Sequence, residues 1–192
     1  ALMENRLRPI HQPVASLNED IDNVHDTLVR IIDNDGNTVL PSEFMPAAER
    51  TGLTKNIDRW VIGASISFVS ATQPKMVFIR LSRQSVVDET SGEWILETLK
   101  NSSIDPHQIC FQLNEGIAIV HLRQVQSLAE QLRSAGCSFA LDHFGGSDNS
   151  LRFLSHVPMD FIKLDGSIMP GLHKDKELQE KIMNMNILAQ GK

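Results

Sequence analysis

The sequence has too few cysteines to be a disulfide-stabilised scaffold. It contains only two, Cys110 and Cys137, and each lies within an apolar run. Two thiols cannot form the dense cross-links of small secreted domains, and buried free thiols are typical of a reducing compartment. We therefore expect a cytoplasmic protein without a disulfide framework.

Long apolar segments and an excess of positive charge are also missing. No apolar run approaches the roughly 20 residues that a membrane-spanning helix needs, and the first residues lack the apolar segment of a signal peptide. The formal net charge is -6, whereas nucleic acids and anionic membranes attract clusters of Lys and Arg. We expect no membrane insertion and no nucleic acid partner.

The sequence does contain enough apolar material for one core. Of its 192 residues, 41% are hydrophobic, which is typical of a single globular domain or of part of a larger one. Short apolar segments predict six β-strands, several of them buried on both faces: 7–17, 24–32, 76–82, 109–114, 138–143 and 160–165. The acidic stretch 18–23 predicts the exposed loop of a hairpin between the first two.

Helical periodicity separates the later strands. Apolar residues three or four apart predict a helix over 118–132 that stops at Gly136, and another helix over 175–189. The segment 42–70 predicts a further helix, broken at Gly52. Strands that alternate with helices indicate an α/β protein with a parallel sheet.

Polar side chains stand at the carboxyl ends of the predicted strands. Alternate residues share one face of a strand, so each strand presents its polar side chains on one side. These residues are Asp26 and Arg30, Arg80 and Ser82, Gln112 and Asn114, Asp142, and Lys163 and Asp165. If these faces point inward, the side chains meet at the end of a barrel where (β/α)8 proteins keep their sites. An open doubly wound sheet also binds ligands at this end and remains the alternative.

Several short motifs occur in an order that resembles an EAL domain. The motifs are QPV at 12–14, DTLVR at 26–30, LPSEF at 40–44, AER at 48–50, IDRWV at 57–61, NE at 114–115, DHFG at 142–145 and FIKLD at 161–165. The resemblance covers residues 1–192 as a single domain and implies a modified (β/α)8 TIM-like barrel. Such a barrel has eight strands in about 250 residues. We therefore expect that the last one or two βα units are missing from this chain.

Active members of this family hydrolyse the bacterial messenger cyclic di-GMP at a two-metal site, and the sequence departs from that site at three positions. Asp26 stands where the signature has glutamate, Arg80 replaces an asparagine, and His143 replaces the second residue of an Asp-Asp pair. A guanidinium cannot ligate a cation, and a carboxylate one methylene shorter retracts by about 1 Å. We expect no bound metal, no required cofactor and no enzyme activity. The remnants of the machinery are Asp26, Glu115, Asp142 and Lys163.

His143 and the glycines after it have competing interpretations. With Asp142 and Glu115, His143 could ligate zinc or manganese, or it could act as a general base. The nearby Arg80 favours ligand contact or simple filling of the site instead. Residues 145–146, both glycine, indicate a turn that needs permissive backbone angles rather than a phosphate cradle.

The ligand-binding half of the pattern is better preserved than the catalytic half. By resemblance, Arg30 contacts a phosphate, Leu28 packs near a base, and Gln12 and Asp58 line the nucleotide pocket. A guanidinium suits a phosphate because it donates two parallel hydrogen bonds. The expected ligand-binding residues are Gln12, Leu28, Arg30, Asp58, Arg80, Glu115, Asp142 and Lys163.

Simpler interpretations exist for some of these residues. Arg30 could form a structural salt bridge, and Asp58 could be an ordinary surface acid. Glu115 could pair with Lys163 or with Arg80 in a buried network. Such a network shifts pKa values without implying catalysis.

Within the family, the sequence resembles degenerate receptors of the FimX type. The similarity lies in the acidic stretch before the signature, in HFG at 143–145 and in KLDGS at 163–167. It implies a bacterial cyclic di-GMP receptor behind PAS and GGDEF domains, which acts on type IV pili and twitching motility. A PilZ-type adaptor, a homodimer and a polar location through partners are further implications. The alternatives are an active phosphodiesterase that uses Mg²⁺ or Mn²⁺, and a ligand-free scaffold for dimerisation or protein docking.

Overall fold

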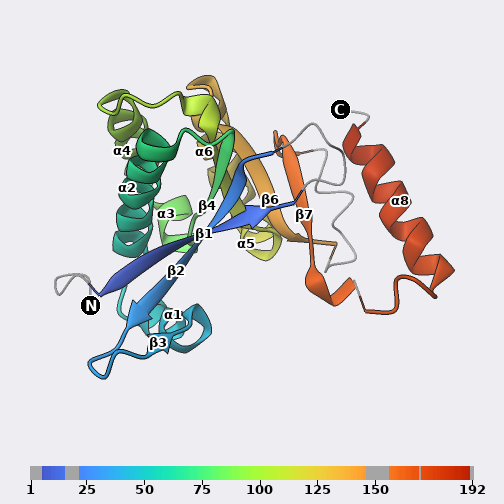
Figure 1. Cartoon of the computed structure of the whole chain (residues 1–192). Helices are drawn as coiled ribbons and strands as arrows, with labels where there is room; N and C mark the ends of the chain where they lie inside the picture. The colour runs from blue at the N-terminus through green and yellow to red at the C-terminus, as the bar shows by residue number, and fades with distance from the viewer. Residues whose placement is uncertain (1–5, 16–21, 146–155, 169, 191–192) are drawn as a thin grey trace.

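The strands form one curved sheet with an edge at β1 and another at β7. The structure, a computed structural model, describes residues 6–15, 22–145, 156–168 and 170–190. The strand order is β1-β2-β4-β5-β6-β7, with the short β3 paired to β2 (Figure 1). The strands are β1 (Leu7–Val14), β2 (Val24–Ile32), β3 (Thr38–Val39), β4 (Met76–Arg80), β5 (Ile109–Asn114), β6 (Ser138–Phe144) and β7 (Phe161–Leu164).

The topology is that of a barrel opened between its first and last described strands. β1 runs antiparallel to β2, whereas β2, β4, β5, β6 and β7 run parallel to one another. Apart from the short β3, each successive strand in the sequence is added on the same side of the one before it, so the strand order in the sheet never reverses. A doubly wound sheet needs such a reversal. The predicted barrel is therefore confirmed, and the doubly wound alternative is wrong.

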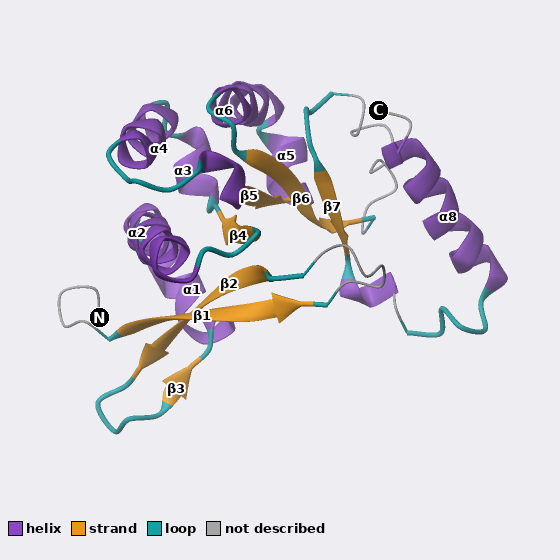
Figure 2. Cartoon of the chain, turned by 45° about the horizontal axis from the view of Figure 1, so that its top comes forward, coloured by secondary structure: helices purple, strands orange, loops and turns teal. Residues whose placement is uncertain are grey.

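Helices cover the outer side of the sheet. In Figure 2, helices α2 to α6 lie on one side of the strands and α8 stands beyond β7. The helices are α1 (Pro41–Arg50), α2 (Thr54–Thr72), α3 (Arg83–Val87), α4 (Thr90–Lys100), α5 (Glu115–Val120), α6 (Leu122–Ser134) and α8 (Lys176–Gln190), with 3-10 turns at Pro106–Gln108 and Gly166–Ile168. None of the described helices is long and apolar enough to cross a membrane.

The central strands are buried on both faces. Toward the helices, Ile79, Phe111 and Phe139 have no exposed surface and belong to the main core. The opposite face holds a smaller apolar cluster that includes Cys110 and Ala140. Burial on both sides explains why these strands are apolar nearly throughout. It also leaves the strand ends as the place where polar side chains can gather.

Two of the predicted helix boundaries are confirmed. Gly52 separates α1 from α2 with φ of 71°, and Gly136 follows α6 with φ of 95°. Both angles lie in the left-handed region, which glycine adopts without steric cost.

The prediction of one continuous helix over 118–132 is wrong. His121 has φ of -116° and ψ of 41°, which ends α5 and begins α6. The apolar spacing continues across this break, so periodicity alone does not reveal it. Helices α3 and α4 and the two-residue β3 are absent from the sequence-based prediction. α4 has Gly92 in its first turn, and glycine weakens a helical pattern.

The first two strands form the predicted hairpin. Their register runs from Leu7 opposite Ile31 to Val14 opposite Val24. The first strand ends at Val14, three residues earlier than the predicted 7–17 segment. Most of the predicted loop at 18–23 lies outside the described residues.

Two histidines and a phenylalanine join this hairpin to α2. The His11 ring stacks on Phe68 with 3.7 Å between centroids, and His25 meets the same ring edge-on at 5.3 Å. The Nδ1 of His11 lies 3.2 Å from Oγ1 of Thr27, which in turn lies 3.3 Å from Oγ of Ser65. Burial lowers the pKa of His11 below its ordinary value, and the nearby His25 lowers it further.

The lowered pKa of His11 predicts a loss of stability in acid. The unfolded chain takes up a proton at the ordinary histidine pKa of about 6.5, whereas folded His11 resists protonation until a lower pH. The free energy of unfolding should therefore decrease as pH falls below about 6.5. Urea titrations between pH 7.5 and 5.5 measure this slope. The slope should be smaller in His11→Gln and unchanged in the exposed control His173→Gln. An equal slope in His11→Gln and wild type would contradict the assignment.

Candidate functional site

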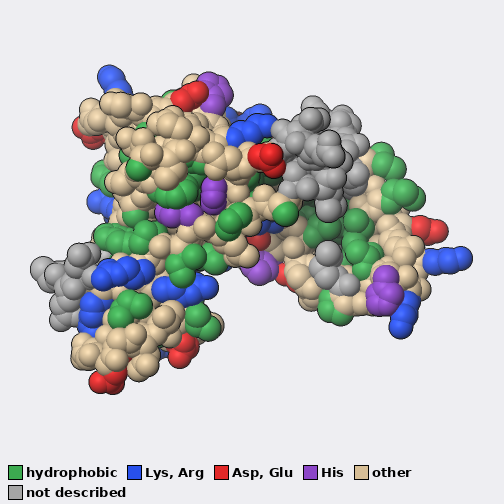
Figure 3. All heavy atoms as spheres, in the orientation of Figure 1, with side chains coloured by type: hydrophobic (Ala, Val, Ile, Leu, Met, Phe, Trp, Pro, Cys, Tyr) green, Lys and Arg blue, Asp and Glu red, His purple; other side chains and the backbone are tan. Residues whose placement is uncertain are grey.

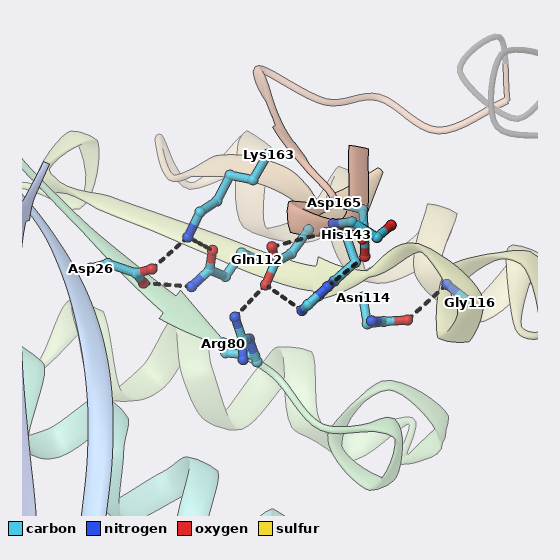
Figure 4. A network of polar contacts seen from close by, with 10 residues as sticks. Asp26, Arg80, Gln112, Asn114, Gly116, His143, Lys163 and Asp165 are labelled. Carbon is cyan, nitrogen blue, oxygen red and sulfur yellow. Dashed lines mark hydrogen bonds and ion pairs between the residues drawn. The ribbon is translucent and has the colours of Figure 1, made fainter. Parts of the chain in front are cut away.

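The polar residues of the strands form two hydrogen-bonded clusters on the inner face of the sheet, one around Lys163 and one around Asp142. The register aligns Asp26 with Phe78 on β4, Arg80 with Gln112 on β5, and Asn114 on β5 with Asp142 on β6. Because Phe78 pairs with Cys110, Asp26 lies two residues before the level of Gln112, and Asp142 lies two residues beyond it. Figure 4 shows Asp26, Gln112 and Lys163 pointing toward one another, whereas Asn114 accepts from the backbone N–H of Gly116 at 2.8 Å. The predicted gathering is therefore present for part of the set, and Arg30 and Ser82 bond elsewhere.

Lys163 is the centre of the first half of the network. Its Nζ lies 2.5 Å from Oδ2 of Asp26 and 2.8 Å from Oε1 of Gln112. Nε2 of Gln112 completes the triangle by donating to Oδ1 of Asp26 at 2.7 Å. The Nζ also stands 5.4 Å from the centre of the Phe78 ring. The ammonium therefore has a carboxylate, an amide oxygen and an aromatic face as partners.

Arg80 and His143 form the second half around Asp142. Nη2 of Arg80 pairs with Oδ2 of Asp142. Nε2 of His143 is 3.8 Å from the same oxygen, beyond hydrogen-bond distance, and its Nδ1 lies 2.9 Å from Oδ2 of Asp165. A hydrogen bond from Ser167, followed by that from His143, lowers the pKa of Asp165 to about 2. His143 therefore contacts a carboxylate as a site-filling residue would.

A bulge in β6 sets the direction of His143. The pairing of β6 with β7 shifts register between Leu141 and Phe144. Within this interval His143 adopts φ of 57°, and Gly145 follows with φ of 89°. A bulge changes the direction of a side chain. Gly145 thus takes the turn conformation that the sequence predicts, whereas residue 146 lies outside the described residues.

Asp58 is buried behind the network and is not the surface acid considered above. It is 6% exposed. One of its oxygens accepts from the Ser82 backbone N–H at 2.7 Å and from Oγ of Ser85 at 2.6 Å. Burial raises the pKa of Asp58 to about 6, against the lowering effect of these hydrogen bonds. Asp58 also lines a cavity of about 190 Å³ together with Leu28 and Arg80.

Three further residues of the predicted ligand set, Gln12, Arg30 and Glu115, make no described side-chain contact with the Lys163 or Asp142 clusters. Gln12 on β1 is paired with Asp26 and is exposed. Arg30 is half-buried on β2, where its Nη1 donates to the Val29 carbonyl at 2.9 Å. Glu115 begins α5 and is 3% exposed.

Neither of the Glu115 pairings considered from sequence is present among the described contacts. Lys163 pairs with Asp26, and Arg80 pairs with Asp142. The structural salt bridge considered for Arg30 is likewise absent, because no described carboxylate pairs with its guanidinium.

Gln112 and Asp165 complete the network although they are missing from the predicted ligand set. Gln112 is fully buried and bridges Asp26 to Lys163. Both residues stand at inward positions near the ends of their strands. Strand alternation already places both among the polar residues of the predicted strands, whereas the resemblance does not assign them to the ligand.

The described donors do not fit a divalent metal as they stand. Among residues 6–15, 22–145, 156–168 and 170–190, no group of three or more His, Cys, Asp or Glu could hold a metal ion. Asp26 is engaged by Lys163 and Asp142 by Arg80. Divalent cations need carboxylates that are available as ligands.

The Gln112 bridge predicts a measurable contribution to stability. Gln112→Leu keeps a similar volume but removes both hydrogen bonds, leaving two charged partners less well satisfied. Hydrogen bonds to charged groups are worth a few kcal/mol, so the free energy of unfolding should fall by about 2 kcal/mol in urea titrations. The exposed Gln124→Leu on α6 is the control and should leave stability nearly unchanged. Equal stability of both variants would show that the bridge contributes nothing.

Two of the curated relatives are named enzymes. The chain is 30% identical to cyclic di-GMP phosphodiesterase PdeF of Escherichia coli, over 88% of this chain and 23% of the relative. It is 32% identical to cyclic di-GMP phosphodiesterase PdeB of Shewanella oneidensis, over 90% of this chain and 21% of the relative. The chain thus spans less than a quarter of the length of either relative.

These relatives correct one prediction. The expectation that the chain is not an enzyme rested on Asp26, Arg80 and His143, and it is wrong when set against relatives named phosphodiesterases. The three substitutions do not establish inactivity, because Asp26, near the start of β2, and Asp142, near the end of β6, remain as carboxylates.

Solved structures and a family model agree on the domain. The FimX EAL domain from Pseudomonas aeruginosa bound to c-di-GMP is 34% identical, with a TM-score of 0.90 over 97% of this chain and 76% of that chain. The Xanthomonas citri FimX EAL domain in complex with c-diGMP is 27% identical, with a TM-score of 0.89 over 99% of this chain and 76% of that one. The EAL domain model matches residues 1–191, and the chain belongs to the EAL domain family.

Proposed function

We propose that this domain binds cyclic di-GMP at the strand-end network. The observation that carries the proposal is Arg30, a half-buried guanidinium with no carboxylate partner among the described residues. An arginine in this setting is well suited to donate paired hydrogen bonds to a phosphate. The FimX EAL domains of 34% and 27% identity, whose structures contain the same ligand, support the assignment.

The ligand has aromatic bases as well as charged phosphates. Leu28 lies on the same strand face as Arg30 and lines the cavity next to Arg80. We assign Leu28 to base contact and Arg30 to phosphate contact. Gln12 is exposed on the neighbouring strand, where it can donate to the ligand. Asp58 lines the same cavity, although its engaged oxygen already accepts from Ser82 and Ser85.

We also propose that binding does not require a metal. Lys163 and Arg80 neutralise Asp26 and Asp142 on the inner face. Carboxylates that are already neutralised by the protein do not need an added cation before an anionic ligand can approach. The expectation of metal-free binding remains a prediction.

The wider setting follows from the resemblance to FimX-type proteins. We propose a bacterial cytoplasmic receptor in a longer protein with PAS and GGDEF domains, which regulates type IV pili and twitching motility. A PilZ-type adaptor and a second copy of the chain are its proposed partners. Co-purification of the full-length protein with a PilZ-type adaptor, with and without cyclic di-GMP, tests the first partner.

Hydrolysis of cyclic di-GMP is the second candidate function. It is favoured by the PdeF and PdeB relatives, which are named phosphodiesterases. Incubation of the domain with the ligand and either Mg²⁺ or Mn²⁺, followed by chromatography of the products, measures it. Turnover that stops on chelation would establish hydrolysis. Binding without turnover would leave recognition as the function, and no binding in any buffer would favour a docking scaffold.

Arg30→Ala provides the direct test of phosphate contact. Calorimetry with cyclic di-GMP in EDTA should show binding to wild type and a loss of affinity of about 100-fold in the variant, because a charge-assisted hydrogen-bond pair is lost. Arg123→Ala removes an exposed arginine on α6 and is the control, with unchanged affinity. Wild-type affinity in Arg30→Ala would refute the phosphate assignment.

A further inference from the structure

Ser85 of α3 and Asp58 of α2 share a buried hydrogen bond beside the candidate site. Oγ of Ser85 donates to Oδ2 of Asp58 at 2.6 Å, and the two residues are only 4% and 6% exposed. The backbone N–H of Ser82 donates to the same oxygen at 2.7 Å. A carboxylate that is removed from water is stable only when hydrogen bonds satisfy it. The two donors provide this for one of the Asp58 oxygens.

The other oxygen of Asp58 is left for the cavity. Asp58 lines the cavity of about 190 Å³ together with Leu28 and Ser82, whereas Ser85 is not one of its lining residues. Among the described residues, Oδ1 of Asp58 accepts no hydrogen bond, since both bonds to this carboxylate end on Oδ2. Bonds that fix Oδ2 also fix the direction of Oδ1. Ser85 therefore supports Asp58 from outside the cavity.

The position of Ser85 is itself fixed by the first turn of α3. Ser82 is the residue before α3, and its Oγ accepts from the backbone N–H of Ser85 at 3.4 Å. Ser82 lies two residues after Arg80, which ends β4 and lines the same cavity. Asp58, Ser82 and Ser85 thus form a closed set of contacts that joins α2 to the end of β4. A side chain held in this way is suited to precise recognition.

The surroundings of Asp58 carry charge of both signs. Glu49 of α1, Arg80 of β4 and Arg83 of α3 line the cavity with it. Burial raises the pKa of Asp58 to about 6, whereas the hydrogen bonds from Ser82 and Ser85 lower it. The Ser85 hydroxyl therefore favours the ionised carboxylate, and its removal should leave Asp58 less ionised at neutral pH.

An ionised carboxylate and a positive surface suit different parts of a nucleotide. Figure 3 shows Lys and Arg side chains gathered over the part of the molecule where β1 starts, and such charge suits phosphates. A base instead presents N–H donors on its edge, for which an ionised carboxylate is a strong acceptor. A carboxyl group that is protonated or turned away loses this capacity.

We propose that Ser85 is a positioning residue for ligand binding, and that its hydroxyl holds Asp58 so that Oδ1 can accept from an N–H group on a base. The inference rests on the proposed binding of cyclic di-GMP. Ser85 acts only through Asp58 and does not touch the ligand. Its loss should therefore affect both the affinity and the pH dependence of binding.

Calorimetry with cyclic di-GMP in EDTA, repeated between pH 5.5 and 7.5, tests the proposal on the purified domain. Wild-type affinity should decrease as pH falls through about 6, because Asp58 becomes protonated. Ser85→Ala should lower affinity about 10-fold at neutral pH, and its decrease should begin at a higher pH. Ser91→Ala removes a buried serine of α4 that does not line the cavity and is the control, with wild-type affinity and pH dependence.

A double variant separates action through Asp58 from a general effect on packing. If Ser85 acts through Asp58, Ser85→Ala should cause little further loss of affinity in an Asp58→Asn background. Circular dichroism at each pH shows whether the fold is retained. Ser85→Cys keeps a similar volume with a weaker donor, and it should show the same changes if the alanine variant does not fold.

Two results would overturn the inference while leaving the proposed function intact. One is wild-type affinity and pH dependence in a folded Ser85→Ala. The other is an equal loss of affinity with and without the Asp58 carboxylate. Absence of binding to wild type would overturn both the inference and the proposed function.

Discussion

The contact of Lys163 with Asp26 and Gln112 is the interaction on which the inner face of the sheet depends. It joins β7 to β2 across 137 residues of sequence and to β5 across 51. A partly buried ammonium and carboxylate lose hydration, and they are stable there only when they satisfy each other with further hydrogen bonds. Gln112 supplies those bonds. Three strands that are not adjacent in the sheet, β2, β5 and β7, are thereby joined on its inner face.

The positive groups around this contact differ in what they can offer a ligand. Lys163 and Arg80 are already engaged by carboxylates, so they set the local potential more than they provide new bonds. Arg30 has no described carboxylate partner and can therefore gain most from a phosphate. The site thus combines two neutralised ion pairs, Lys163 with Asp26 and Arg80 with Asp142, with the positive charge of Arg30 on the β1–β2 hairpin. That division suits a ligand whose charge lies on its ring and whose bases extend away from it.

Sequence reasoning predicts the parts of this structure that follow from local pattern. Nearly continuous apolar runs around Phe111 and Phe139 predict the buried strands, and Gly52 and Gly136 predict helix ends. It does not predict the break at His121, because the apolar face continues across it. For the site, strand alternation brings Asp26, Arg80, Asp142 and Lys163 together. The partners of each are fixed by register and by the β6 bulge, which depend on contacts distant in sequence.

The hairpin of β1 and β2 also bears on the order in which the site is assembled during folding. Arg8 and Arg30, which are paired across the two strands, are only 22 positions apart in the sequence, so a local turn is enough to bring them together. The ion pair of Asp26 with Lys163 forms later, because Lys163 is synthesised 137 residues after Asp26. The β1–β2 hairpin can form while the rest of the barrel is still being synthesised, whereas the Lys163 cluster forms only when β7 docks. The contacts of Lys163 with Asp26 and Gln112 therefore form late, after β7 has been synthesised and has paired with β6.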